Sequence, residues 1–167
     1  IEKIFNVKLS NYKIVNKAVS NFNGTSDFYL SELDLCSSLL KYKFVKMKKK
    51  IACEVITLEK FCSEEKIDNI VFLHVDTQGS DLDVLKGLKF YKSIVHEGVI
   101  ETMLNKEDLN YVGACTLDDV KNFFQGSSYE IIEEKYNAPK ELNVYFKNKK
   151  CKNTNKISIN KFNPRFL

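Results

Sequence analysis

Apolar residues gather in short runs along the middle of the chain, separated by polar and turn-forming residues. The six residues 70–75 are nearly all apolar, which is typical of a central parallel strand that is covered on both faces. An alternating, β-branched stretch at 51–56 and a run at 95–100 predict two further strands. The middle of the chain therefore predicts three strands.

Helical patterns fill the stretches between and after these strands. Thr57 has the position of an N-cap at the start of a short helix. Ser80 and Asp83 predict a capping box at the start of a helix over 80–89, and Thr116 opens a third helix. Because strands and helices alternate, the sequence predicts a three-layer α/β sheet.

The N-terminal stretch carries weaker patterns. Residues 2–9 predict the last turns of a helix, and residues 12–19 predict a strand. Asn23 and Gly24 give a strong turn signal, so residues 27–30 are expected to pair behind them as a hairpin strand.

Two strands, at 129–132 and 142–146, come last among the predicted elements. The loop between them is too short for a crossover helix, so they should be antiparallel to each other. The sequence thus predicts a mostly parallel sheet with an antiparallel strand pair at one edge. We expect a partial domain over residues 1–148 and a Lys/Asn-rich tail over residues 149–167.

Composition is that of a soluble globular chain: of 167 residues, 44% are hydrophobic and 29% charged. No apolar run approaches the ~20 residues that span a bilayer, and no secretory leader is visible, so we expect a cytoplasmic protein. The net charge of +4 is modest, and no nucleic-acid partner is expected. Residues 41–50 hold six lysines, which could bind phosphate or nucleic acid, although a solvated loop or edge is the favoured interpretation.

The sequence gives no support for a disulfide framework, a metal site or a glycine-rich phosphate loop. The five cysteines form no CxxC pair and their number is odd, so reduced thiols are expected. With only two histidines a multi-histidine metal site is hard to build, and we expect no metal. His74 is expected in the core. The spacing of the glycines gives neither a GxGxxG loop nor a P-loop.

The clearest candidate site directly follows the most buried strand. In open α/β sheets, ligands bind outside the carboxyl ends of the strands, where Asp76 would project into the crevice. Gly79 permits a sharp turn there. Glu101 follows the next strand in the same way, so the two carboxylates could line one polar pocket. The alternative is that Asp76 and Gly79 only shape a loop and that Glu101 is a solvated carboxylate.

The segment from Phe72 to Gly87, FLHVDTQGSDLDVLKG, resembles the signature of the FkbM-type methyltransferases, which runs roughly K-[IV]-D-x-[QE]-G-x-E-x-x-[VI]-L-K-G. Further matches follow in the family's order: 16–20 with Asn23 and Gly24, 37–39, 55–58, 100–101 and 142–146. The likeness covers most of residues 12–148, and the ordered set is more specific than any one piece.

This resemblance implies a Rossmann-like class I methyltransferase fold, with S-adenosylmethionine (SAM) as the cofactor. It also implies methylation of a hydroxyl group on a small-molecule or glycan acceptor: a sugar, a polysaccharide or a natural product. Ala18, Val19 and Ser20 would then lie near the adenine side of the cofactor, and Asp76 near the methyl side.

The catalytic roles follow from the same resemblance. Asp76 is the first candidate for a base or for the group that orients the acceptor. Gln78 would hydrogen-bond substrate or cofactor, and Glu101 would support the pocket.

The sequence departs from the family at several points. His74 stands where Lys is usual, and Glu59 and Asp81 replace the commoner Asp and Glu. The glycine-rich cofactor loop and the acidic ribose-binding strand end, which belong upstream, are absent. Because no Met precedes Met47, we expect an N-terminally truncated domain that is inactive alone. The alternative hypothesis is a non-catalytic Rossmann-like domain that binds a glycan or a protein and has lost the SAM site.

Overall fold

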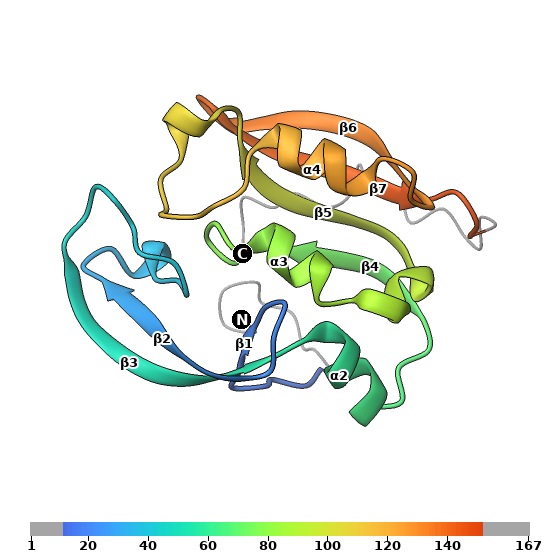
Figure 1. Ribbon diagram of the computed structural model, residues 1–167, viewed down its shortest axis with the longest axis horizontal. Coiled ribbons are helices and arrows are strands. Elements are labelled where there is room, and N and C mark those ends of the chain that lie inside the picture. Colours follow the sequence, from blue (N-terminus) through green and yellow to red (C-terminus); the bar gives the residue numbers. More distant parts are fainter. Residues whose placement is uncertain (1–11, 152–167) are drawn as a thin grey trace. The chain divides into compact units, whose positions relative to one another are not determined.

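The computed structural model describes residues 12–151, which form a mixed α/β structure with two sheets (Figure 1). Residues 17–150 form one compact unit, and residues 12–16 and 151 belong to a second. Seven strands and three α-helices lie within the described residues. The predicted helix at 2–9 falls outside them.

The first sheet is built around its longest strand. Its members are β1 (Ala18–Val19), β2 (Gly24–Ser31) and β3 (Met47–Ile56), in the order β1-β3-β2. β1 runs parallel to β3 and β2 antiparallel to it. The predicted hairpin between 12–19 and 27–30 is therefore wrong. Only two residues of the first stretch are strand, and β3 lies between β1 and β2 because both of its edges accept a partner.

The second sheet contains the strand predicted over residues 70–75, but this strand lies at the edge of the described sheet and not at its centre, and most of its residues are only partly buried. The sheet has the order β4-β5-β7-β6, with β4 (Ile70–Val75), β5 (Val95–Met103), β6 (Tyr129–Ala138) and β7 (Glu141–Asn148). β4 is parallel to β5, while β7 is antiparallel to both β5 and β6. The antiparallel closing pair is confirmed. A mostly parallel sheet is not, since antiparallel pairings predominate in the described residues, where connections such as that between β6 and β7 are too short for a crossover.

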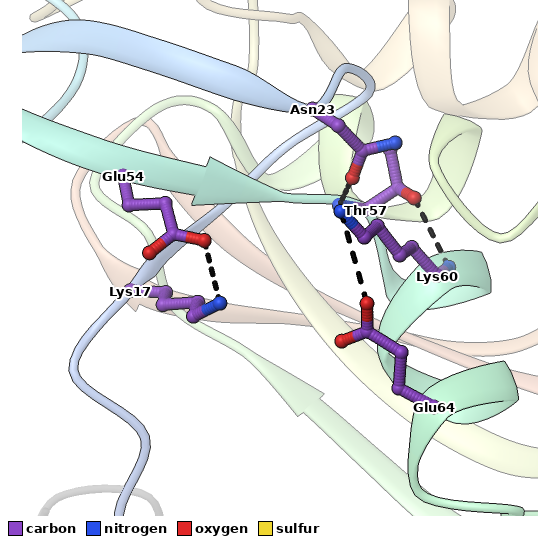
Figure 2. A network of polar contacts seen from close by, with 6 residues as sticks. All are labelled: Lys17, Asn23, Glu54, Thr57, Lys60 and Glu64. Carbon is purple, nitrogen blue, oxygen red and sulfur yellow. Dashed lines mark hydrogen bonds and ion pairs between the residues drawn. The ribbon is translucent and has the colours of Figure 1, made fainter.

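Side-chain caps explain where two of the helices begin. The helices are α2 (Leu58–Glu64), α3 (Asp81–Lys86) and α4 (Leu117–Phe124). The Thr57 hydroxyl accepts a hydrogen bond from the backbone N–H of Lys60 (Figure 2), and Thr116 forms a capping box with Asp119. Both caps agree with the sequence prediction.

The predicted capping box of Ser80 and Asp83 is wrong. Ser80 is the N-cap of α3, but its side chain caps no backbone N–H. Its hydroxyl instead donates to the hydroxyl oxygen of Thr77 at 3.0 Å. Asp83 pairs with Lys86 at 2.9 Å. The reason is local, because the backbone at Ser80 is not in the extended conformation of an ordinary N-cap.

The core lies between the second sheet and helices α3 and α4. Val95, Ile100 and Val144 of the sheet are completely buried, as is Val120 of α4. At Gly98 of β5, a Cβ atom would lie 2.5 Å from Cζ of Phe146 and 2.6 Å from the carbonyl oxygen of Leu73. This close packing fixes β5 beside β4, so the carboxyl ends of these two parallel strands stand together.

Candidate functional site

The carboxyl end of β4 leads directly into the candidate site. In the parallel pairing of β4 and β5, Val75 is opposite Ile100, so Asp76 and Glu101 follow at the same level of the sheet. Asp76 is exposed, and Glu101 is partly buried. The charge of Asp76 is one cause of the raised pKa of Glu101.

The loop between β4 and α3 has an unusual backbone that brings a tyrosine against it. Gln78 and Gly79 have φ values of 57° and 97°, in the left-handed region. A Cβ atom at Gly79 would lie 2.9 Å from the Tyr111 ring, so glycine lets this ring approach the loop. The Ser38 hydroxyl donates to the carbonyl oxygens of Thr77 and Gln78 at 3.1 and 2.8 Å. The loop is thus held from two other segments of the chain.

A chain of hydrogen bonds reaches Asp76 through Gln78. The Tyr111 hydroxyl donates to Oε1 of Gln78 at 2.8 Å, and Nε2 of Gln78 donates to Oδ1 of Asp76 at 2.6 Å. Burial raises the pKa of the Tyr111 hydroxyl, which stays a donor at neutral pH. Gln78 therefore orients one carboxylate oxygen of Asp76.

Asp81 supports this loop from beneath. Its side chain is fully buried and accepts hydrogen bonds from the backbone N–H groups of Thr77 at 3.2 Å and Gly79 at 3.1 Å. Burial raises the pKa of Asp81 to about 7, with a smaller contribution from the charge of Asp76, while the two N–H donors oppose the rise. A carboxyl group thus shapes the loop and titrates near neutral pH.

Glu101 is the second carboxyl group with altered acidity. Burial raises its pKa to about 8, and the charges of Glu141, Asp76 and Asp81 add to the effect. Nδ2 of Asn137 donates to its Oε2 at 3.2 Å and opposes the rise. Near neutral pH Glu101 therefore holds a proton that it can donate.

A small cavity lies beside these groups. It has a volume of about 20 Å³, and its lining includes Gly79, Glu101, Tyr111 and Glu141. A cavity of this size holds about one water molecule. Proton-carrying and hydrogen-bonding groups therefore converge at one point next to an exposed carboxylate.

Ala18, Val19 and Ser20 lie elsewhere. Ser20 is buried, and its backbone N–H donates to the carbonyl oxygen of Ile56 at 3.2 Å. Its own carbonyl oxygen lies against Gly87, the C-cap of α3, where a Cβ atom would overlap it. Asp76 precedes the other end of this helix. The structure thus brings Asp76, Gln78 and Glu101 together and does not join the β1 residues to them.

Reasoning from the sequence did not identify five residues of the site, which are Ser38, Asp81, Tyr111, Asn137 and Glu141. Asp81 lies inside the motif quoted above, where it replaces the commoner Glu. The motif does not show that this residue supports the loop. Tyr111 is 33 residues from Gln78 in the chain, in a stretch without a periodic pattern, so no local signal points to it.

Comparison with known proteins gives one match. A family model described as "Methyltransferase FkbM domain" matches residues 5–134, which include Asp76, Gln78 and Glu101. No curated protein and no solved structure matches the chain. Within residues 12–151, no helix has the length and apolar character required to cross a membrane.

Proposed function

The chain belongs to the FkbM methyltransferase family, and from this membership we propose that it methylates a hydroxyl group of a sugar, a polysaccharide or a natural product, with SAM as the methyl donor. The observation that carries the proposal is the exposed carboxylate of Asp76 at the carboxyl end of β4, beside Glu101. We propose with it the three-layer, Rossmann-like arrangement, which the parallel unit of β4, α3 and β5 supports.

The charge of the site suits this cofactor. Asp76 and Glu141 are carboxyl groups whose charges reach Glu101, and a sulfonium ion carries a positive charge. When bound, SAM supplies an electrophilic methyl group. Of the cofactor residues that the resemblance suggests, Asp76 fits this chemistry. The assignment of Ala18, Val19 and Ser20 stays a prediction.

Asp76 would bind the acceptor and take its proton. Gln78 occupies Oδ1 of Asp76, and no described residue is hydrogen-bonded to the other carboxylate oxygen. A hydroxyl group of the acceptor could donate to that oxygen, which would position the hydroxyl. The same oxygen would accept its proton when the C–O bond forms and the methyl–sulfur bond of the donor breaks, with S-adenosylhomocysteine as the leaving group. Positioning of this kind can supply about 7–11 kcal/mol, and a general base about 10²–10⁴-fold in rate. Glu101, when protonated, can donate a hydrogen bond to a second oxygen of the acceptor.

Replacement of Asp76 by Asn in the full-length protein tests the proposal. Asp76→Asn keeps the size and the hydrogen bond with Gln78 but removes the base, so turnover should fall about 10²–10⁴-fold. The measurement is formation of S-adenosylhomocysteine with a panel of sugar acceptors. Asp83→Asn, on the neighbouring helix α3, is the matched control and should keep wild-type turnover.

Calorimetric titration with SAM separates the proposal from a non-catalytic role. Binding of SAM together with loss of turnover in Asp76→Asn supports a methyltransferase. Turnover that is unchanged in Asp76→Asn removes the assigned role of this residue. If the protein does not bind SAM but binds a glycan, the chain is a binding domain.

A further inference from the structure

Exposed apolar side chains gather on three loops beside the candidate site. Leu33 and Leu35 lie at the short 3₁₀ helix η1 (Asp34–Cys36), Phe44 precedes β3, and Val112 follows β5. Their exposed fractions are 56%, 84%, 71% and 56%. Large apolar side chains with this much exposure, on loops whose backbones are hydrogen-bonded to one another, indicate a surface that contacts another molecule.

Backbone hydrogen bonds hold these three loops together. The N–H of Glu32 donates to the carbonyl oxygen of Lys46 at 3.3 Å, which joins η1 to the segment that precedes β3. The N–H of Lys43 donates to the carbonyl oxygen of Asn110 at 2.9 Å, and the N–H of Val112 donates to the carbonyl oxygen of Lys41 at 3.0 Å. Residues far apart in the sequence therefore form one surface.

Lysines alternate with the apolar residues on this surface. Lys41, Lys43 and Lys46 are exposed, and none of them forms an ion pair with a residue that the structure describes. The stretch 32–49 contains five lysines against two acidic residues. We name the set Leu33, Leu35, Lys41, Lys43, Phe44, Lys46 and Val112 the lysine-apolar rim.

We propose that the lysine-apolar rim docks on a lipid bilayer that contains anionic lipid. The lysines complement the negative headgroups, and the apolar side chains, Phe44 and Leu35 above all, enter the boundary between headgroups and acyl chains. A single-stranded nucleic acid would match the charge and could stack a base on Phe44, but it would leave the aliphatic side chains of Leu33, Leu35 and Val112 in water. The combination of charge and exposed apolar surface therefore favours lipid.

The rim borders the site described above. Tyr42 lies between Lys41 and Lys43, and the centroid of its ring is 4.9 Å from the centroid of the Tyr111 ring. The Tyr111 hydroxyl in turn donates to Gln78. Docking would hold Asp76 close to the lipid surface. The inference does not depend on methyl transfer, because it rests on exposure and charge alone.

Flotation of the full 167-residue chain with vesicles tests the proposal. The chain should float with vesicles of phosphatidylcholine and phosphatidylserine (about 70:30) and stay behind with phosphatidylcholine alone, and salt should weaken the binding. Each lysine near such a surface contributes about fivefold, so K41Q/K43Q/K46Q should bind about 100-fold more weakly. L35S/F44S should lose about tenfold or more at unchanged charge.

A matched control removes the same charge elsewhere. K60Q/K135Q/K149Q changes three exposed lysines outside the rim and should bind within about threefold of the wild type. Equal loss in this control overturns the proposal, because net charge alone would then explain the binding. Absence of flotation with the anionic vesicles also overturns it. So does binding of an oligonucleotide that requires the rim lysines and is unchanged in L35S/F44S. Circular dichroism of each variant establishes that it is folded.

Discussion

Replacement of the buried Asp81 by Asn tests which force controls its protonation. Two opposing effects act on this carboxyl group: burial disfavours its charge, and hydrogen bonds from Thr77 and Gly79 favour it. Asn has nearly the shape of a protonated Asp and never ionises. The stability of Asp81→Asn relative to the wild type should therefore change with pH, because only the wild type can ionise at this position.

The pKa gives the sign and the size of the effect. Because the folded-state pKa of Asp81, about 7, lies above its ordinary 3.8, its contribution to stability is fully present below pH 3.8 and is lost as the pH rises through 7. Each pKa unit is worth about 1.4 kcal/mol, so ionisation of Asp81 can cost the wild type roughly 4 kcal/mol at most by pH 8.5.

Two other groups titrate in the same range. Glu101 acts in the same direction, since burial and neighbouring carboxylates raise its pKa to about 8. His74 acts in the opposite direction below pH 6.5, because burial lowers its pKa. Both are present in the wild type and in Asp81→Asn. Loss of the Asp81 charge, which helps to raise the pKa of Glu101, acts in the same direction as loss of Asp81 ionisation and adds to the expected change at high pH.

Urea unfolding followed by circular dichroism at pH 5 and pH 8.5 measures this difference. At pH 5, Asp81→Asn should be about 1–2 kcal/mol less stable than the wild type, because its amide group leaves one backbone N–H without an acceptor. At pH 8.5 the deficit should vanish or reverse. Asp83→Asn, two residues away on α3, should show no such change with pH. A larger deficit of Asp81→Asn at pH 8.5 than at pH 5 would refute the reasoning, since the N–H donors would then outweigh burial.

Three further substitutions test the packing and the hydrogen bonds. Gly98→Ala should lower the free energy of unfolding in urea by about 3 kcal/mol or more, because the new Cβ atom meets Phe146 and the backbone of Leu73. Gly113 has open space around it, so Gly113→Ala should lower the same free energy by only about 1–2 kcal/mol, because of its φ of 84°. Tyr111→Phe should cost about 1 kcal/mol and lower methyl transfer, because Gln78 loses its donor; unchanged turnover would remove Tyr111 from the site. Thr116→Ala should lower thermal stability by about 1 kcal/mol through loss of the capping box, and equal loss in Ser80→Ala, whose hydroxyl does not cap α3, would contradict this.

The sequence predicted the elements whose pattern allows one interpretation. The apolar run at 70–75 is β4 to the residue, and the threonine caps mark the starts of α2 and α4. The first half of β3 was missed because Met47 and the lysines after it look like a solvated loop. They are a strand because β2 pairs with their backbone, while their side chains remain in solvent or only partly covered.

The site was predictable where it depends on one segment and not where distant segments meet. Asp76 follows β4, and the parallel pairing with β5 brings it to the level of Glu101. The prediction that Glu101 follows its strand is wrong, because β5 continues to Met103 through its pairing with β7. The contacts of Tyr111 and Ser38 with the loop depend on how loops far apart in the sequence fold over one another. No periodic pattern encodes such contacts, because each is fixed by tertiary packing.

The amide of Gln78 has a consequence for the choice of acceptor. Its oxygen accepts a hydrogen bond from Tyr111, and its nitrogen donates one to Asp76. A ligand that forces Gln78 to rotate must therefore break both hydrogen bonds. Molecules that approach Asp76 with a hydroxyl group avoid this penalty. A bulky amine would collide with the amide of Gln78, and a carboxylate would be repelled by the negative charge of Asp76. The site would thus select among nucleophiles by the hydrogen bonds that they break as well as by the contacts that they form.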